Sequence, residues 1–153
     1  MMNLTERKKA IWNDALASHK EVIDNYATSI KELQSSVTTV GEENYDNSTI
    51  GQQSETFEQI SHLREQLDFA KEELDLMNRM ELDHVHQQVQ LGSVVETDKR
   101  IFFLSVSVEE FESNGEKLFG LSLKSPLGMA MLGKKRDDSF SYGDTTYTIK
   151  SLY

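Results

Sequence analysis

The first half of the chain carries two apolar seams with helical spacing. The first seam consists of Trp12, Leu16, His19, Ile23, Tyr26, Ile30, Leu33 and Val37, separated by alternating steps of four and three residues. The second consists of Ile60, Leu63, Leu67, Ala70, Leu74 and Met77, with the same alternation. Such an a/d pattern is typical of coiled-coil helices. Neither seam contains a proline, so neither helix has an obvious break.

Turn-forming residues separate the two seams. The segment Thr38–Gly51 contains two glycines and several Asn, Ser and Thr residues, which favour a turn over a continuous helix. We therefore predict an antiparallel helical hairpin over residues 1–82, with its tip at about residues 38–51.

The register of this hairpin follows from matching the ends of the seams. Matching them sets Val37 beside Ile60 and Ile30 beside Leu67, which places the apex near Asn47–Thr49. A helix rises by about 1.5 Å per residue. The helix that carries the first seam is therefore long, and we expect the hairpin to project beyond the part of the protein formed by the second half of the chain.

Short strand-like runs fill the second half, and they are separated by turn residues. The predicted strands are residues 89–96, 100–108, 117–123, 139–142 and 145–153. A short helix is expected over Ser125–Gly133, with Ser125 as N-cap, Pro126 at the first helical position and Gly133 closing it. Its apolar residues are expected to cover one face of the sheet; they are Leu127, Ala130, Met131 and Leu132.

The predicted fold class is therefore α+β, with two parts. The first part is an α-helical coiled-coil hairpin at residues 1–82, followed by a linker at residues 83–88. The second part, residues 89–153, is an antiparallel sheet domain that includes one short helix.

Composition narrows the class of protein. The chain has 26 acidic and 16 basic side chains and a formal charge of −10, which argues against a protein that binds nucleic acid or membranes by neutralising phosphates. It has no cysteine, which excludes a thiol nucleophile, disulfides and zinc-thiolate sites. No apolar run approaches the roughly 18 residues of a membrane span, and the first residues lack the apolar core of a secretory signal. We expect a cytoplasmic protein without a membrane partner.

The negative charge is concentrated around the hairpin tip. No lysine or arginine lies between Lys31 and Arg64, and this interval holds several acids. Three of them lie in the turn and take no part in the pairing of the two seams: Glu42, Glu43 and Asp46. Clustered carboxylates repel one another, and their placement suits a cation, either a metal ion or a basic channel.

Other candidate sites are weaker. Asp83, His84 and His86 form a small ligand-like cluster in the linker, although histidines two apart share a metal only in extended backbone. His19 occupies a seam position and is interpreted as a polar residue that sets the register. The basic run Lys134–Arg136 is interpreted as a solvated turn balanced by the two aspartates that follow it.

One segment of the second half resembles a known family. Residues 125–138, SPLGMAMLGKKRDD, are similar to the C-terminal domain of the bacterial Gre transcript-cleavage factors. The matching residues are Ser125, Pro126, Leu127, Leu132, Gly133, Lys134, Asp137 and Asp138. The order of parts also resembles that family, in which a coiled coil precedes an FKBP-like sheet domain. The resemblance covers the whole chain in architecture and residues 125–138 in sequence.

The resemblance implies a function in transcription. Gre factors bind bacterial RNA polymerase through the sheet domain, insert the coiled coil into the secondary channel, and place two tip acids beside a catalytic Mg²⁺ that the polymerase holds. The polymerase then cleaves the 3′ end of backtracked RNA. By this resemblance the chain is not an enzyme itself, needs no cofactor of its own, and meets RNA and DNA only through the polymerase. Ser125, Pro126 and Leu127 are the expected docking residues.

The tip leaves two assignments of the acidic pair open. Gre tips usually read Gly-Asp-x-x-Glu-Asn-Ala-Glu-Tyr, whereas this chain reads GEENYD from Gly41 to Asp46. Either Glu42 and Glu43 form the pair, or Glu43 and Asp46 do, at a spacing of three. Two alternative functions also stay open: a regulator that occupies the channel without stimulating cleavage, and a coiled-coil adaptor unrelated to polymerase. Nothing in the sequence predicts an oligomeric state.

Overall fold

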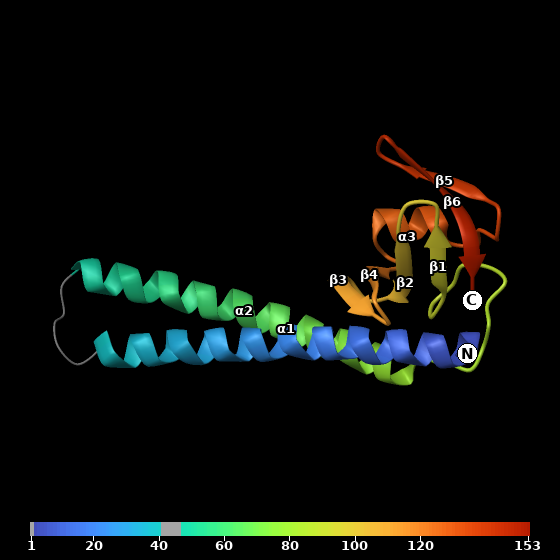
Figure 1. The fold of residues 1–153 in the computed structure, drawn as a ribbon. Coiled ribbons are helices and arrows are strands. Elements are labelled where there is room, and N and C mark those ends of the chain that lie inside the picture. The colour runs from blue at the N-terminus through green and yellow to red at the C-terminus, as the bar shows by residue number, and fades with distance from the viewer. Residues whose placement is uncertain (1, 41–46) are drawn as a thin grey trace. The chain divides into compact units, whose positions relative to one another are not determined.

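The computed structural model combines two long helices with a sheet and a short helix (Figure 1), so the predicted α+β class is confirmed. The structure describes the backbone of residues 2–40 and 47–153 and the side chains of residues 2–37 and 53–153. The helices are α1 (Leu4–Val40), α2 (Asn47–Arg79) and α3 (Pro126–Met131). The strands are β1 (Val94–Thr97), β2 (Ile101–Ser105), β3 (Val108–Ser113), β4 (Glu116–Ser122), β5 (Ser139–Tyr142) and β6 (Thr145–Leu152).

The chain divides into two compact units. One contains Met1–Ser18 together with Asp75–Tyr153, and the other contains His19–Leu74. The first turns of α1, as far as Ser18, and the last turn of α2, from Asp75, therefore belong with the sheet. Residues 83–88, which the sequence predicts as a linker, fall within the first unit.

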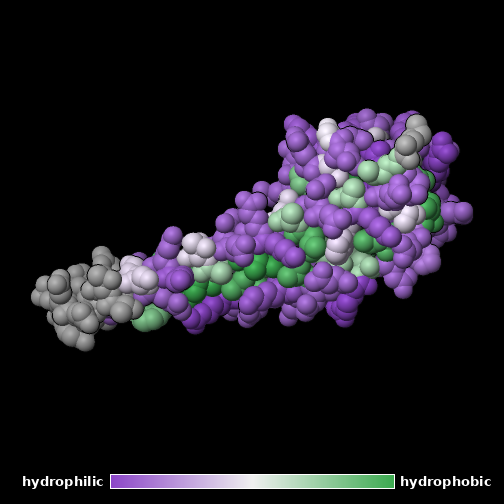
Figure 2. Space-filling view, turned by 60° about the horizontal axis from the view of Figure 1, so that its bottom comes forward, coloured by the Kyte–Doolittle hydropathy of each residue, from purple (hydrophilic) through white to green (hydrophobic). Residues whose placement is uncertain are grey.

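Both long helices bury the seams that the sequence predicts. Every residue of the two seams is buried or half-buried, and Figure 2 shows hydrophobic residues as a stripe between hydrophilic flanks along the helices. At the start of α1, the Asn3 carboxamide oxygen accepts from the Glu6 amide at 2.8 Å, and the Glu6 carboxylate accepts from the Asn3 amide at 3.1 Å. This reciprocal capping box satisfies backbone donors that a helix start leaves free.

Two side-chain bonds fix the register between α1 and α2. In the first unit, Trp12 Nε1 donates to the Met77 carbonyl at 2.8 Å. In the second unit, His19 Nε2 lies 2.8 Å from the Ala70 carbonyl. Because a carbonyl oxygen only accepts, His19 carries its proton on Nε2. The histidine thus sets the register, as its seam position suggests.

The predicted register was wrong. Counting from the His19 bond puts Ile30 level with Ile60 rather than with Leu67. The predicted apex, Asn47–Thr49, forms the first turn of α2. The error arose because the seam continues before Ile60 through half-buried Gln53 and Thr56, and polar seam residues are invisible to an apolar pattern.

The six strands form one sheet in the order β3-β4-β2-β1-β6-β5. Strands β2 and β4 run parallel, whereas the other neighbours are antiparallel. The prediction of a wholly antiparallel sheet was therefore wrong, because it merged β2 and the start of β3 into one strand. Asn114 and Gly115, with φ of 52° and 82°, form the tight turn between β3 and β4. An Asn-Gly pair is a strong hairpin signal that would have revealed the missing strand.

The sheet is covered on both faces. Helix α3 covers a core that includes Phe102, Phe140, Tyr147 and Met131. Alternation along the strands turns Val94, Phe103 and Leu118 to the other face, where all three are fully buried. On that face the Arg7 guanidinium of α1 lies 3.0 Å from the Glu96 carboxylate of β1 and 2.5 Å from the Glu116 carboxylate of β4. In the described parts of the chain, every helix is too short or too polar to cross a membrane.

Candidate functional site

The acids predicted to act in catalysis lie in the connection between the two long helices. Helix α1 ends at Val40 and α2 begins at Asn47, so this connection is residues 41–46. Glu42, Glu43 and Asp46 all lie within it, outside the described residues. In the sequence, all three acids therefore lie between the last residue of α1 and the first residue of α2.

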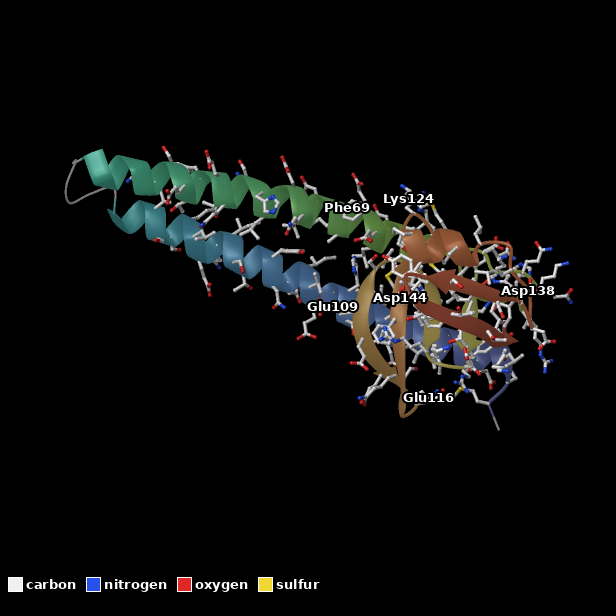
Figure 3. The ribbon with its side chains drawn as sticks, turned by 90° about the horizontal axis from the view of Figure 1, so that it is seen from above. Phe69, Glu109, Glu116, Lys124, Asp138 and Asp144 are labelled. Atoms are coloured by element: carbon white, nitrogen blue, oxygen red, sulfur yellow. The ribbon has the colours of Figure 1, made fainter. Side chains whose placement is uncertain are left out.

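We call the parts of α1 and α2 that belong to the second unit the helical shaft. Its exposed side chains include acids and aromatic residues. Glu32, Glu55 and Glu58 are exposed, as is Phe57. Phe69 is also 60 % exposed and points away from the ribbon (Figure 3). The aromatic residues lie singly along the shaft rather than in one patch, so we assign them no site.

The three predicted docking residues differ in their burial and in their contacts. Ser125 is the N-cap of α3: its hydroxyl donates to the Ser122 carbonyl at 2.6 Å and accepts from the Gly128 amide at 3.1 Å. Leu127 is half-buried and packs against the core. Pro126 alone of the three is exposed. Ser125 and Leu127 therefore hold α3 on the sheet, and their side chains are already engaged within the unit.

Gly128 explains how closely α3 approaches the sheet. It is buried, and a Cβ atom at this position would lie 2.2 Å from the Ser122 carbonyl oxygen. A glycine is therefore needed where the helix meets the end of β4. Met131 is fully buried on the same side of the helix.

The outward side of α3 exposes apolar side chains. Pro126, Met129 and Leu132 follow one another at a spacing of three, and all are exposed. Met129 and Leu132 are 58 % and 52 % exposed. Leu132 was predicted to cover the sheet, and this was wrong: the helix ends at Met131, so the chain turns away before Leu132 can reach the core.

Basic residues flank this apolar row. Lys124 lies just before the N-cap, and Lys134, Lys135 and Arg136 follow the helix. None of these four cations forms an ion pair with another described residue. Lys135 and Arg136 are exposed, in agreement with the solvated turn predicted there, whereas the exposure of Met129 was not predicted. Residues 117–136 contain no acid.

The side chain of Lys8 contacts two members of the predicted metal-ligand cluster, His84 and His86. Lys8 is fully buried, and its ammonium donates to the His84 carbonyl at 2.6 Å and lies 3.5 Å from His86 Nδ1. The same Nδ1 lies 2.9 Å from the Ser93 hydroxyl. Asp83 instead pairs with Lys9 at 2.9 Å. In the described part of the chain, no three His, Asp or Glu residues come together as metal ligands.

Burial controls the protonation of this cluster. Desolvation lowers the pKa of Lys8 to about 8. The pKa of His86 is lowered by burial and by the charge of Lys8. His86 Nδ1 therefore acts as an acceptor beside the lysine, which leaves the imidazole proton on Nε2. We interpret the arrangement as the attachment of the α2–β1 connection to α1.

Comparison with known proteins leaves the family open. No family model matches the chain, and no curated protein matches it.

Proposed function

We propose that the chain is a regulator of bacterial RNA polymerase that acts through the secondary channel. In this proposal the helical hairpin enters the channel, and its connecting residues bring carboxylates to the catalytic Mg²⁺ of the polymerase. The sheet unit, which we propose to be FKBP-like, docks outside the channel. The chain supplies no active site of its own and stimulates cleavage of backtracked RNA by the polymerase.

One observation carries this proposal most directly. The two long helices end on either side of residues 41–46, and this segment contains three acids and no base. Carboxylate oxygens are the ligands that Mg²⁺ prefers, and a further carboxylate stabilises a metal that also holds an attacking water. The similarity of residues 125–138 to the Gre C-terminal domain supplies the second line of support.

A cleavage assay tests the proposal. A backtracked elongation complex is incubated with the wild-type chain and with the Glu42→Ala/Glu43→Ala/Asp46→Ala variant. We expect wild type to shorten the RNA from its 3′ end and the variant to lose this effect while it still binds the polymerase. A wild-type chain that does not bind core polymerase would sink the proposal and favour a coiled-coil adaptor with another partner.

The spacing of the tip acids favours a second candidate. The segment Gly41–Asp46 is shorter than the usual Gre tip and has Glu42 where that family has aspartate. Because an added methylene moves a carboxylate by about an ångström, metal-assisted chemistry is sensitive to this change. The second candidate is a regulator that occupies the channel without stimulating cleavage. Binding and inhibition of nucleotide addition without RNA shortening would identify it.

A further inference from the structure

The two edge strands of the sheet, β3 and β5, are built differently. β3 carries exposed Glu109, Glu110 and Glu112, and its pairing with β4 contains a shift in register. Exposed charges and irregular pairing are common means by which an edge strand avoids pairing with another chain. β5 reads Ser-Phe-Ser-Tyr, so it has no charged residue and no proline, and its pairing with β6 is uninterrupted. β3 therefore has protective features that β5 lacks.

Side-chain contacts between β5 and β6 indicate which backbone groups of β5 face its open side. The Ser139 and Thr148 hydroxyls lie 3.1 Å apart, and the Ser141 and Thr146 hydroxyls lie 3.0 Å apart. In an antiparallel pair, opposite residues alternate between pairs that exchange backbone hydrogen bonds and pairs that do not, and the second kind brings side chains closer together. The short hydroxyl contacts therefore indicate that both serines occupy non-hydrogen-bonded positions.

A backbone hydrogen bond next to these pairs supports the same alternation. The Ile149 amide donates to the Asp138 carbonyl at 2.9 Å, so the adjoining pair, Ser139 with Thr148, is a non-hydrogen-bonded one. The amide and carbonyl groups of Ser139 and Ser141 therefore point away from β6. β5 is the last strand in the order of the described sheet, and Figure 1 shows it at the margin of the sheet unit. These backbone groups thus face an open edge.

The spacing of the two serines allows β5 to pair with β5 of a second copy. A two-fold axis at Phe140 sets Ser139 of one copy opposite Ser141 of the other, and each such pair can exchange both of its backbone hydrogen bonds. In this register, residues that precede β5 lie opposite residues that follow it. Arg136 therefore comes near Asp144 of the second copy. Both are exposed, and neither forms an ion pair with another described residue. The edge is thus complementary to itself in hydrogen bonds and in charge.

We propose that the chain self-associates as a two-fold dimer in which the β5 edges of two copies pair antiparallel and join their sheets. A two-fold interface uses the same surface on both copies, so the assembly closes at two. The strand is short, and small interfaces are typical of weak, reversible complexes. The proposal does not depend on the proposed function, and its test does not use the polymerase.

Sedimentation equilibrium of the full chain tests the proposal. We measure from about 10 μM to 1 mM protein at about 0.15 M salt, where exposed charges more than about 8 Å apart are largely screened. The mean mass should rise from that of a monomer toward that of a dimer. Ser141→Pro should raise the dimer Kd at least about tenfold, because it removes an amide donor from the open edge and none of the bonds to β6. The matched control, Ser141→Ala, keeps this amide and should associate like wild type.

A pair of charge variants tests the register. Ser139→Lys/Ser141→Lys sets lysines opposite each other across the two-fold axis and should raise the dimer Kd at least about tenfold. This variant also reduces the negative charge of the chain, so general repulsion between copies would have the opposite effect. Ser139→Lys/Ser141→Glu sets each lysine opposite a glutamate and should associate at least as tightly as wild type. Circular dichroism of each variant verifies that it is folded.

The outcomes are decisive for the β5 edge. A wild-type chain that stays monomeric up to about 1 mM overturns the proposal and leaves this edge to a strand of another protein. Association that is equal in wild type, Ser141→Pro and both charge variants also overturns it, because the copies then meet at another surface. A mass that rises beyond that of a dimer contradicts the closed two-fold pairing.

Discussion

Lys8 and His86 lie in contact inside the sheet unit, with the lysine Nζ 3.5 Å from the histidine Nδ1. Lys8 is fully buried and forms no ion pair with a described carboxylate. A buried cation without a counter-charge favours its neutral form. The burial of Lys8 therefore makes the stability of this unit depend on pH.

We predict that stability rises with pH between about 8 and 9.5. The pKa of Lys8 is lowered from 10.5 to about 8, so in this window the unfolded chain binds more protons than the folded one and stability increases with pH. The slope should approach about 1 kcal/mol per pH unit. Urea unfolding followed by Trp12 fluorescence measures it, because Trp12 is the single tryptophan and bonds Met77 in the same unit.

Two variants control this measurement. Lys8→Met should lose the slope, whereas Lys9→Met, which removes an exposed lysine paired with Asp83, should retain it. The predicted rise in stability ends below pH 10, because Tyr153 lowers stability at higher pH. Burial raises the pKa of Tyr153, so the folded chain keeps a proton that the unfolded chain loses. An unchanged slope in Lys8→Met would show that another group is responsible.

The helix register gives a second prediction, which the absence of cysteine makes simple to test. With Ile30 level with Ile60, an Ile30→Cys/Ile60→Cys variant should form a disulfide under mild oxidation. An Ile30→Cys/Leu67→Cys variant should not, because Leu67 lies two turns away, or about 10 Å, along α2. Non-reducing electrophoresis of the oxidised proteins reads the result. Faster crosslinking of the second variant would restore the register expected from the apolar seams.

The sequence alone predicts the elements of this protein better than their pairing. Both seams are buried as predicted, since heptad periodicity follows directly from helix geometry. The register failed because Gln53 and Thr56 extend the seam with polar residues. Strand β3 was missed because its exposed acids conceal its periodicity. The local pattern predicted Ser125 as N-cap and Leu127 on the sheet side of α3, and both are confirmed. It failed at Leu132, because its exposure depends on where α3 ends and the chain turns away from the sheet.

A third prediction concerns Arg7, which joins α1 to two strands. Its guanidinium pairs with Glu96 at 3.0 Å and with Glu116 at 2.5 Å, and its side chain is 29 % exposed. Arg7→Ala should lower the free energy of unfolding by about 1–2 kcal/mol, since it leaves two carboxylates without their partner. Urea unfolding at pH 7 measures the change. Lys9→Ala, which breaks only an exposed pair, should have no measurable effect, and equal effects of the two variants would contradict the prediction.

A fourth prediction concerns the close approach of α3 to β4. Gly128→Ala would place a Cβ atom 2.2 Å from the Ser122 carbonyl, so helix or strand must shift. We expect a loss of about 1–3 kcal/mol, the usual cost of overpacking. Met129→Ala changes the neighbouring exposed residue and should stay within about 0.5 kcal/mol of wild type. Thermal unfolding compares the two, and a neutral Gly128→Ala would mean that α3 packs less tightly than described.

The last prediction decides which tip acids act, and it rests on the proposed function. Both assignments of the acidic pair contain Glu43, so Glu43→Ala should abolish stimulation of RNA cleavage under either one. Glu42→Ala should abolish it only if Glu42 and Glu43 form the pair, and Asp46→Ala only if Glu43 and Asp46 do. Loss of a metal-directed carboxylate should reduce the cleavage rate by at least about tenfold with unchanged polymerase affinity. The exposed shaft variant Glu58→Ala is the matched control, because it removes the same charge from α2 without altering residues 41–46. Full activity of Glu43→Ala would exclude both pairs.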